Sequence, residues 1–166
     1  MDGAPMRQAI RLAAILLKAT LYLIGVLISV YATINLYGLL VYRYYLYPIP
    51  KKISSLPTKN TQFLPTPYGN ITYQFYFNPT NRFTILYSHG NATDLQRLKY
   101  TLAQYINQGF NIIAYDYNGY GFSQGTPSER AVYADVTAVY NFLTRTKQIP
   151  TKNIFAVGHS FGCAPS

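Results

Sequence analysis

Ser160 lies in the segment of the chain whose residue types and spacing best suit nucleophilic catalysis. The pentapeptide Gly158-His159-Ser160-Phe161-Gly162 follows the apolar run at residues 153–157. A G-x-S-x-G pattern directly after a buried strand is typical of a nucleophile elbow, a sharp turn from strand to helix. Gly158 and Gly162 have no side chain, so neighbouring backbone can approach closely. The pattern therefore predicts that the Ser160 hydroxyl projects above the sheet edge and attacks a carbonyl carbon.

The same chemistry needs N–H groups that stabilise the negative oxygen formed during the attack. The N–H of Phe161 is predicted to lie at a helix N-terminus, where it can donate to that oxygen. A second donor is expected from the loop after an earlier buried strand. The segment Ser88-His89-Gly90-Asn91-Ala92 fits this place. We predict that Asn91 donates through its backbone, and that His89 and Gly90 support the shape of the loop.

Asp116 ends another buried strand and precedes a glycine-rich loop. In this type of site the acid and the histidine base follow the serine in chain order. Because Asp116 precedes Ser160, we interpret it as a structural carboxylate that holds the glycine-rich loop. Asp135 and Glu129 fall on a predicted helix and are interpreted as structural or solvated carboxylates.

The chain has two histidines, and neither suits the role of base. His89 is interpreted as a residue that packs the oxyanion loop. His159 is adjacent to Ser160, and neighbouring side chains on a tight turn point apart. A serine without a base is a weak nucleophile at neutral pH. The triad acid and base are thus expected outside these 166 residues.

The elements that must position these groups alternate between strands and helices. Four strands and two helices are predicted, at residues 71–77, 82–88, 110–115 and 153–157, and at 94–108 and 127–147. The turn at residues 78–81 predicts a hairpin between the first two strands. The later alternation predicts an α/β fold with a mostly parallel sheet, right-handed crossovers and helices on both faces.

A long apolar segment precedes this domain. Residues 19–42 contain no charged side chain, and about 20 residues suffice for a helix to cross a bilayer. The predicted organisation is a basic segment at 1–18, a transmembrane helix at 19–42, a Pro/Lys linker at 43–60 and a truncated α/β domain at 61–166. A cleaved signal peptide and a buried soluble helix are the alternatives. Basic residues flank both sides about equally, so the positive-inside rule does not decide the orientation.

Charge and cysteine content restrict the function classes. The net charge is +9, but the basic residues are scattered and form no helix face or aromatic platform of the kind that nucleic-acid binding requires. We therefore expect no nucleic-acid partner. Cys163 is the single cysteine, which excludes an intrachain disulfide. No Cys/His metal spacing is present. Acyl transfer through a serine implies neither a metal nor an organic cofactor, so none is expected.

Three blocks, YSHGNATDL, YDYNGYGFSQGTPSERAVYAD and GHSFGCAP, resemble the α/β-hydrolase superfamily. More narrowly, they resemble its membrane-associated abhydrolase-domain serine hydrolases, a group that includes protein depalmitoylases. The resemblance covers residues 61–166 and corresponds to the N-terminal half of such a domain. It implies hydrolysis of an ester or thioester, in some members on a lipidated protein, without a cofactor and at a lipid bilayer. Those relatives use an acylated cysteine-rich N-terminus, which this chain replaces with a helix.

We therefore expect a fragment of a single-pass, membrane-anchored serine hydrolase, with little turnover by these residues alone. The rival hypothesis is a non-catalytic, membrane-tethered interaction remnant of a hydrolase. Asn91-Ala92-Thr93 is a glycosylation sequon, and a glycan there would block the oxyanion loop. In a secretory eukaryote this favours a cytosolic catalytic face.

Overall fold

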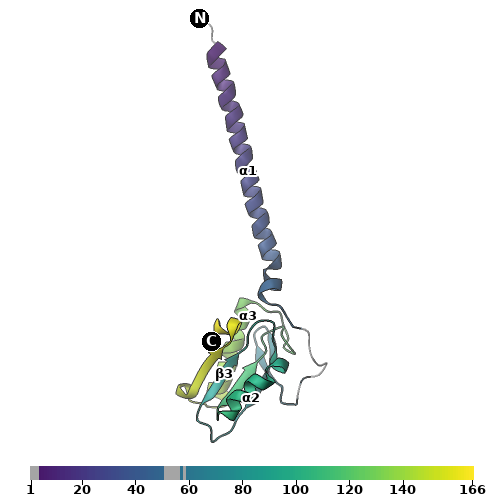
Figure 1. Cartoon of the computed structure of the whole chain (residues 1–166), viewed down its shortest axis with the longest axis vertical. Coiled ribbons are helices and arrows are strands. Elements are labelled where there is room, and N and C mark those ends of the chain that lie inside the picture. The colour runs from purple at the N-terminus through teal and green to yellow at the C-terminus, as the bar shows by residue number, and fades with distance from the viewer. Residues whose placement is uncertain (1–3, 51–56, 58) are drawn as a thin grey trace. The chain divides into compact units, whose positions relative to one another are not determined.

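The computed structural model describes residues 4–50, 57 and 59–166 of the chain (Figure 1). It divides into two compact units, residues 1–42 and residues 43–166. The first three residues of the predicted basic segment, and residues 51–56 and 58 of the predicted linker, lie outside the described residues.

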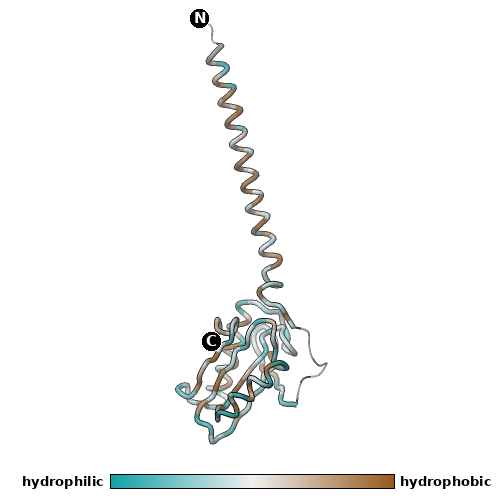
Figure 2. Tube along the Cα trace, viewed as in Figure 1, coloured by the Kyte–Doolittle hydropathy of each residue, from teal (hydrophilic) through white to brown (hydrophobic). Residues whose placement is uncertain are grey.

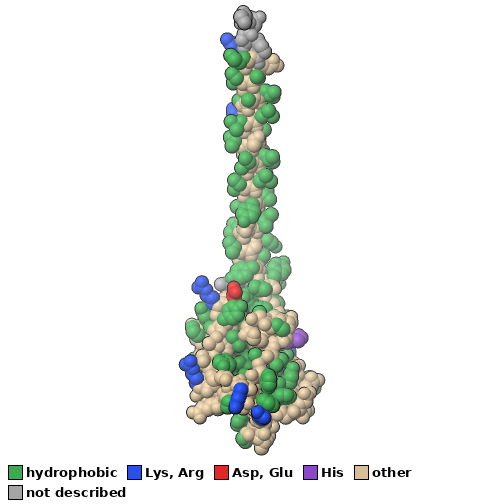
Figure 3. All heavy atoms as spheres, turned by 90° about the vertical axis from the view of Figure 1, so that its left-hand side faces the viewer, with side chains coloured by type: hydrophobic (Ala, Val, Ile, Leu, Met, Phe, Trp, Pro, Cys, Tyr) green, Lys and Arg blue, Asp and Glu red, His purple; other side chains and the backbone are tan. Residues whose placement is uncertain are grey.

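The first unit belongs to a single helix, α1 (Ala4–Leu46), which continues beyond both ends of the predicted span. Its stretch Met6–Tyr42 is long and apolar enough to cross a membrane. Hydrophobic residues follow one another along it (Figure 2), and hydrophobic side chains cover the face in view (Figure 3). The polar side chains of Thr20, Thr33 and Asn35 donate to carbonyl oxygens one turn earlier, at 2.8–2.9 Å. These bonds lower the cost of placing polar groups in an apolar surrounding.

The second unit is built on a five-stranded sheet. Its strands are β1 (Gln62–Thr66), β2 (Gly69–Tyr76), β3 (Thr84–Ser88), β4 (Asn111–Tyr115) and β5 (Ile154–Gly158). Their spatial order is β1-β2-β4-β3-β5. The strands β4, β3 and β5 are parallel, as expected, whereas β1 and β2 extend the sheet with antiparallel pairings.

The predicted hairpin between residues 71–77 and 82–88 is wrong. β2 pairs with β1 on one side and with β4 on the other, and β3 lies between β4 and β5. The turn at residues 78–81 instead connects β2 to a strand in the interior of the sheet. All five residues of this strand, β3, are buried. β1 escaped prediction because it is a short edge strand that contains Pro65, a residue tolerated at sheet edges but atypical of strands.

The helices are shorter than the sequence pattern predicts. The first predicted helix is divided into a single turn, η1 (Leu95–Arg97), and α2 (Lys99–Asn107). The second begins at α3 (Glu129–Asn141) and ends in a wider turn, η2 (Phe142–Thr146). The Ser128 hydroxyl caps α3 by accepting from the N–H of Ala131 at 3.2 Å, which explains why the helix starts after Pro127. Two further single turns are η3 (Thr151–Asn153) and η4 (Ser160–Cys163).

The sheet is covered on both faces, as the alternation of elements predicts. Successive residues of a strand point to opposite faces, so Ile85 and Ile112 pack with α2 and η1, whereas Leu86 and Ile113 pack with α3. β5 forms one edge of the sheet, and its residue Phe155 is 48% exposed. These layers bring the C-terminal ends of β3, β4 and β5 to the same edge of the sheet, where ligands bind in open α/β folds.

Candidate active site

The turn between β5 and η4 holds Ser160 in a strained backbone conformation. Its φ of +52° lies in the left-handed region that L-residues with a side chain rarely adopt. The N–H of His159 donates to Ser88 O at 3.0 Å, and the N–H of Gly162 donates to His159 O at 2.9 Å. The turn is therefore bonded to the end of β3, and the neighbouring strand holds the strained residue in place.

The two glycines of the motif lie where the backbone leaves no room for a side chain. A Cβ on Gly158 would lie 2.3 Å from Gly162 O. A Cβ on Gly162 would lie 2.0 Å from Ser88 O. Both neighbours are backbone atoms, so they cannot rotate away. The spacing of the two glycines thus has a direct steric cause.

The structure brings the elbow and the predicted oxyanion loop to one cleft. Ser160, His159, Gly90 and Asn91 all line a cavity of about 350 Å³. The remaining lining side chains come from the end of β3 and from the turns that lead into α2: Tyr87, Thr93, Arg97, Leu98 and Thr101. Two sequence segments about 70 residues apart in the chain thus form one site.

The predicted oxyanion donors are unused by the protein itself. Within the described part of the chain, the N–H groups of Asn91 and Phe161 donate no hydrogen bond. The side chain of Asn91 is engaged instead: Nδ2 donates to Leu46 O at 2.5 Å, and Oδ1 accepts from the Tyr120 hydroxyl at 2.6 Å. The Asn91 side chain is thus bonded through both its amide nitrogen and its amide oxygen.

His89 and Asp116 face each other beneath this loop. The imidazole of His89 is fully buried, its Nδ1 lies 2.7 Å from Gly90 O, and its Nε2 lies 3.4 Å from Asp116 Oδ1. Asp116 also accepts from the N–H of Leu95 at 2.8 Å and from the Thr72 hydroxyl at 3.1 Å. These contacts join β2, η1 and the oxyanion loop, and neither His89 nor Asp116 lines the cleft that Ser160 lines.

Asp116 also lies against the glycine-rich loop after β4. A Cβ on Gly121, which has a φ of +50°, would lie 2.0 Å from Asp116 Oδ2. The hydroxyl of Ser123 donates to Asp116 O at 2.9 Å. The loop therefore closes directly over the carboxylate.

No activating base is bonded to Ser160 in the described part of the chain. The hydroxyl of Ser160 and the imidazole of His159 make no hydrogen bond there, although both residues are exposed at the cleft. Nor do three His, Cys, Asp or Glu side chains gather at any one place among the described residues in a way that could hold a metal ion.

Two buried residues near the site were not predicted from the sequence. Tyr47, assigned to the linker, is 5% exposed and belongs to the core around Phe161. Asp135 is fully buried and accepts from the N–H of Asn118 at 2.8 Å. Burial raises the pKa of Asp135 to about 7, because the charged form loses its hydration. Helical spacing alone does not show which carboxylate of α3 is buried.

We expect Asp135 to make the folded state less stable as the pH rises. An unfolded Asp loses its proton near pH 3.9, whereas folded Asp135 holds it to about pH 7. Between these values the folded state binds more protons, so its free energy of unfolding falls as the pH rises and levels off above pH 7. Asp135→Asn keeps an acceptor for the N–H of Asn118 and should flatten this slope. At pH 7.5 the free energy of unfolding of the variant should exceed that of the wild type by up to about 4 kcal/mol.

Urea unfolding between pH 4.5 and 7.5 measures this difference. Glu129→Gln is the matched control, because Glu129 lies on the same helix but is exposed. Its pH slope should equal that of the wild type. An unchanged slope in Asp135→Asn would contradict the assignment of the buried proton.

A sheet covered on both faces, with a strained serine between a strand and a helical turn at its C-terminal edge, defines the α/β-hydrolase fold. A family model described as serine aminopeptidase, S33, matches residues 79–165, slightly more than half of the chain. The chain belongs to this family of α/β-hydrolases.

Curated relatives and solved structures agree with this assignment. The chain is 43% identical over 91 residues to the alpha/beta hydrolase domain-containing protein aho-3 of Caenorhabditis elegans, and 41% identical over 92 residues to protein 17C of the same description from Homo sapiens. Each match covers 53% of this chain and 27% of the relative, so the chain spans little more than a quarter of these proteins. The resemblance to the superfamily is thereby confirmed.

Among solved structures, the Pyrococcus furiosus esterase Pf2001 superposes with a TM-score of 0.56 at 16% identity, over 69% of this chain and 49% of the esterase. An alpha-beta serine hydrolase homologue from Coxiella burnetii gives a TM-score of 0.54 at 20% identity, over 66% of this chain and 55% of that one. At these identities the likeness shows the fold alone, and the chain covers about half the length of each of the two solved structures.

Proposed function

We propose that this chain belongs to a membrane-anchored serine hydrolase that cleaves esters or thioesters through an acyl-enzyme on Ser160. The observation that carries the proposal is the strained φ of Ser160 at the cleft it shares with Asn91. Strain at a residue in an exposed cleft has no benefit for stability and is typical of a functional site.

In the proposed reaction, Ser160 Oγ forms a bond to the substrate carbonyl carbon and loses its proton to a base. The N–H groups of Asn91 and Phe161 donate to the resulting oxyanion. The intermediate then expels an alcohol or thiol, which takes up the proton. Water then attacks the acyl carbon, the bond to Ser160 Oγ breaks, and the carboxylic acid and the Ser160 hydroxyl are released. The base and its acid partner are assigned to parts of the whole protein beyond these residues, so these residues alone should turn over little substrate.

We propose that α1 holds this site at a bilayer, where acyl esters, thioesters and lipidated proteins are concentrated. The composition of Met6–Tyr42 supports this role. The bond from Asn91 Nδ2 to Leu46 O supports a cytosolic face, because a glycan on that nitrogen would displace Leu46. A depalmitoylase-like activity on membrane proteins fits these features best.

A second candidate is a membrane-tethered interaction protein without catalysis. It is favoured by one observation: in the described residues, neither histidine is hydrogen-bonded to Ser160. Such a protein would keep the cleft but would not form an acyl-enzyme.

Labelling with a fluorophosphonate probe separates the two candidates. The full-length protein is expressed in cells, the membranes are washed with alkaline carbonate, and the pellet is treated with the probe. We expect a covalent adduct in the pellet, mapped by mass spectrometry to the peptide that contains Ser160. An adduct at another residue would refute the nucleophile, absence of an adduct would favour the interaction protein, and recovery in the supernatant would refute the anchor.

A further inference from the structure

The segment that follows the apolar part of α1 contacts one side of the candidate oxyanion hole. Leu46 O accepts from Asn91 Nδ2 at 2.5 Å, and Asn91 Oδ1 accepts from the Tyr120 hydroxyl at 2.6 Å. The side chain of Asn91 is therefore held between Leu46 and the loop after β4. Because both ends of the Asn91 amide are bonded, the backbone at Asn91 has little freedom to rotate. These two bonds therefore orient the N–H of Asn91.

The next residue contacts the other side. Tyr47 is 5% exposed and packs edge to face on Phe161, with ring centroids 5.7 Å apart and an interplanar angle of 84°. Phe161 packs in the same manner on Tyr117 at 5.5 Å. The Tyr117 hydroxyl donates to His89 O at 2.8 Å, which leads back to the oxyanion loop. Two neighbouring residues thus contact the two elements that carry the predicted donors.

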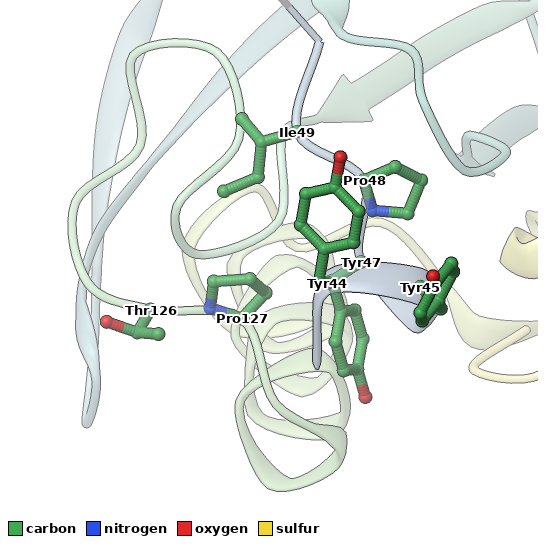
Figure 4. A pocket seen from close by; sticks show the side chains of 7 residues that line it. All are labelled: Tyr44, Tyr45, Tyr47, Pro48, Ile49, Thr126 and Pro127. Atoms are coloured by element: carbon green, nitrogen blue, oxygen red, sulfur yellow. The ribbon is translucent and has the colours of Figure 1, made fainter. Parts of the chain in front are cut away.

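The same segment is seated on the domain beyond these contacts. Figure 4 shows Tyr47, Pro48 and Ile49 around a cavity of about 540 Å³ that the loop at Thr126 and Pro127 also lines. Pro127 is buried. Tyr47 is thus the buried residue of this segment, whereas Ile49 stays 53% exposed at the rim of the cavity.

We propose that Leu46 and Tyr47 position the oxyanion hole, so that the end of α1 is part of the catalytic architecture and not only a tether. This rests on the proposed function. Tyr47 is a positioning residue: it touches no reacting atom and acts through Phe161. A donor must lie within hydrogen-bond distance of the oxyanion to stabilise it, so a shift of the Phe161 turn weakens the transition state while ground-state binding persists.

The test compares Tyr47→Ala with Tyr47→Phe in the full-length protein, using p-nitrophenyl butyrate as substrate. Loss of the ring is expected to lower kcat about 10- to 100-fold with KM unchanged. Tyr47→Phe keeps the ring contact with Phe161 and should restore kcat to within a few-fold of the wild type. Leu102→Ala is the matched control, because Leu102 is 2% exposed but packs on the opposite face of the sheet.

Each outcome decides the proposal. A fall in kcat confined to Tyr47→Ala supports it, and an equal fall in Leu102→Ala shows general destabilisation and overturns it. If Tyr47→Ala does not fold, Asn91→Ala serves instead. It keeps the backbone N–H but removes the bonds to Leu46 and to Tyr120, so it is compared with Tyr120→Phe, which removes only the second bond. A kcat below that of Tyr120→Phe at constant KM supports the proposal, and a kcat equal to it overturns it. Activity that survives Ser160→Ala would instead refute the proposed function.

Discussion

Ser160→Ala in the full-length protein is expected to lower kcat for ester hydrolysis by about 10⁶-fold, the loss seen when a serine hydrolase loses its nucleophile. Without Oγ no acyl-enzyme can form, and the oxyanion donors can only assist direct attack by water. Alanine keeps the Cβ and places no atom in a new position, so the free energy of unfolding should change by less than about 0.5 kcal/mol. Steady-state kinetics and urea unfolding measure the two quantities.

Cys163→Ala is the matched control for this result. Cys163 is an exposed thiol three residues after Ser160, and its Sγ donates to Gly158 O at 3.2 Å. If the serine is the nucleophile, removal of this thiol should leave turnover within a few-fold of the wild type. Loss of turnover in Cys163→Ala together with retention in Ser160→Ala would transfer the nucleophile to the cysteine.

Gly162→Ala is expected to destabilise the fold by about 3 kcal/mol or more. The new Cβ would lie 2.0 Å from Ser88 O and 2.7 Å from His89 O, and both oxygens belong to the backbone at the end of β3. Relief would require the elbow to separate from this strand and to break the bond from His159 N to Ser88 O. A loss of this size is a large part of the 5–15 kcal/mol of a typical domain.

Gly38→Ala provides the comparison, because no atom lies within 4 Å of a Cβ at that position in α1. Alanine also favours helix over glycine by about 1 kcal/mol. Urea unfolding followed by tyrosine fluorescence should show a lower urea midpoint for Gly162→Ala. The midpoint of Gly38→Ala should not fall below that of the wild type. Equal midpoints in Gly162→Ala and the wild type would show that the elbow yields more easily than its contacts suggest.

Local sequence patterns predicted the elements that depend on neighbouring residues. The elbow at Ser160 was recognisable because a strand, two glycines and a serine at fixed spacing produce one turn. The parallel strands β4 and β5 were recognisable as short apolar runs. The hairpin prediction failed because strand partners are chosen by the whole sheet: β2 lies next to β4, which follows it by about 35 residues.

Residue type and period alone predicted a nucleophile role for Ser160, the covering of the sheet by helices and the apolar character of α1. Three features became visible only in the folded structure. Tyr47, which was assigned to the linker, packs on Phe161. Asp135 is buried whereas Glu129 is exposed, and Gly162 has no room for a side chain. These depend on atoms far apart in the chain, whose distances no local pattern encodes. The strained serine was predicted from its motif, whereas the contacts that hold its surroundings are visible only after folding.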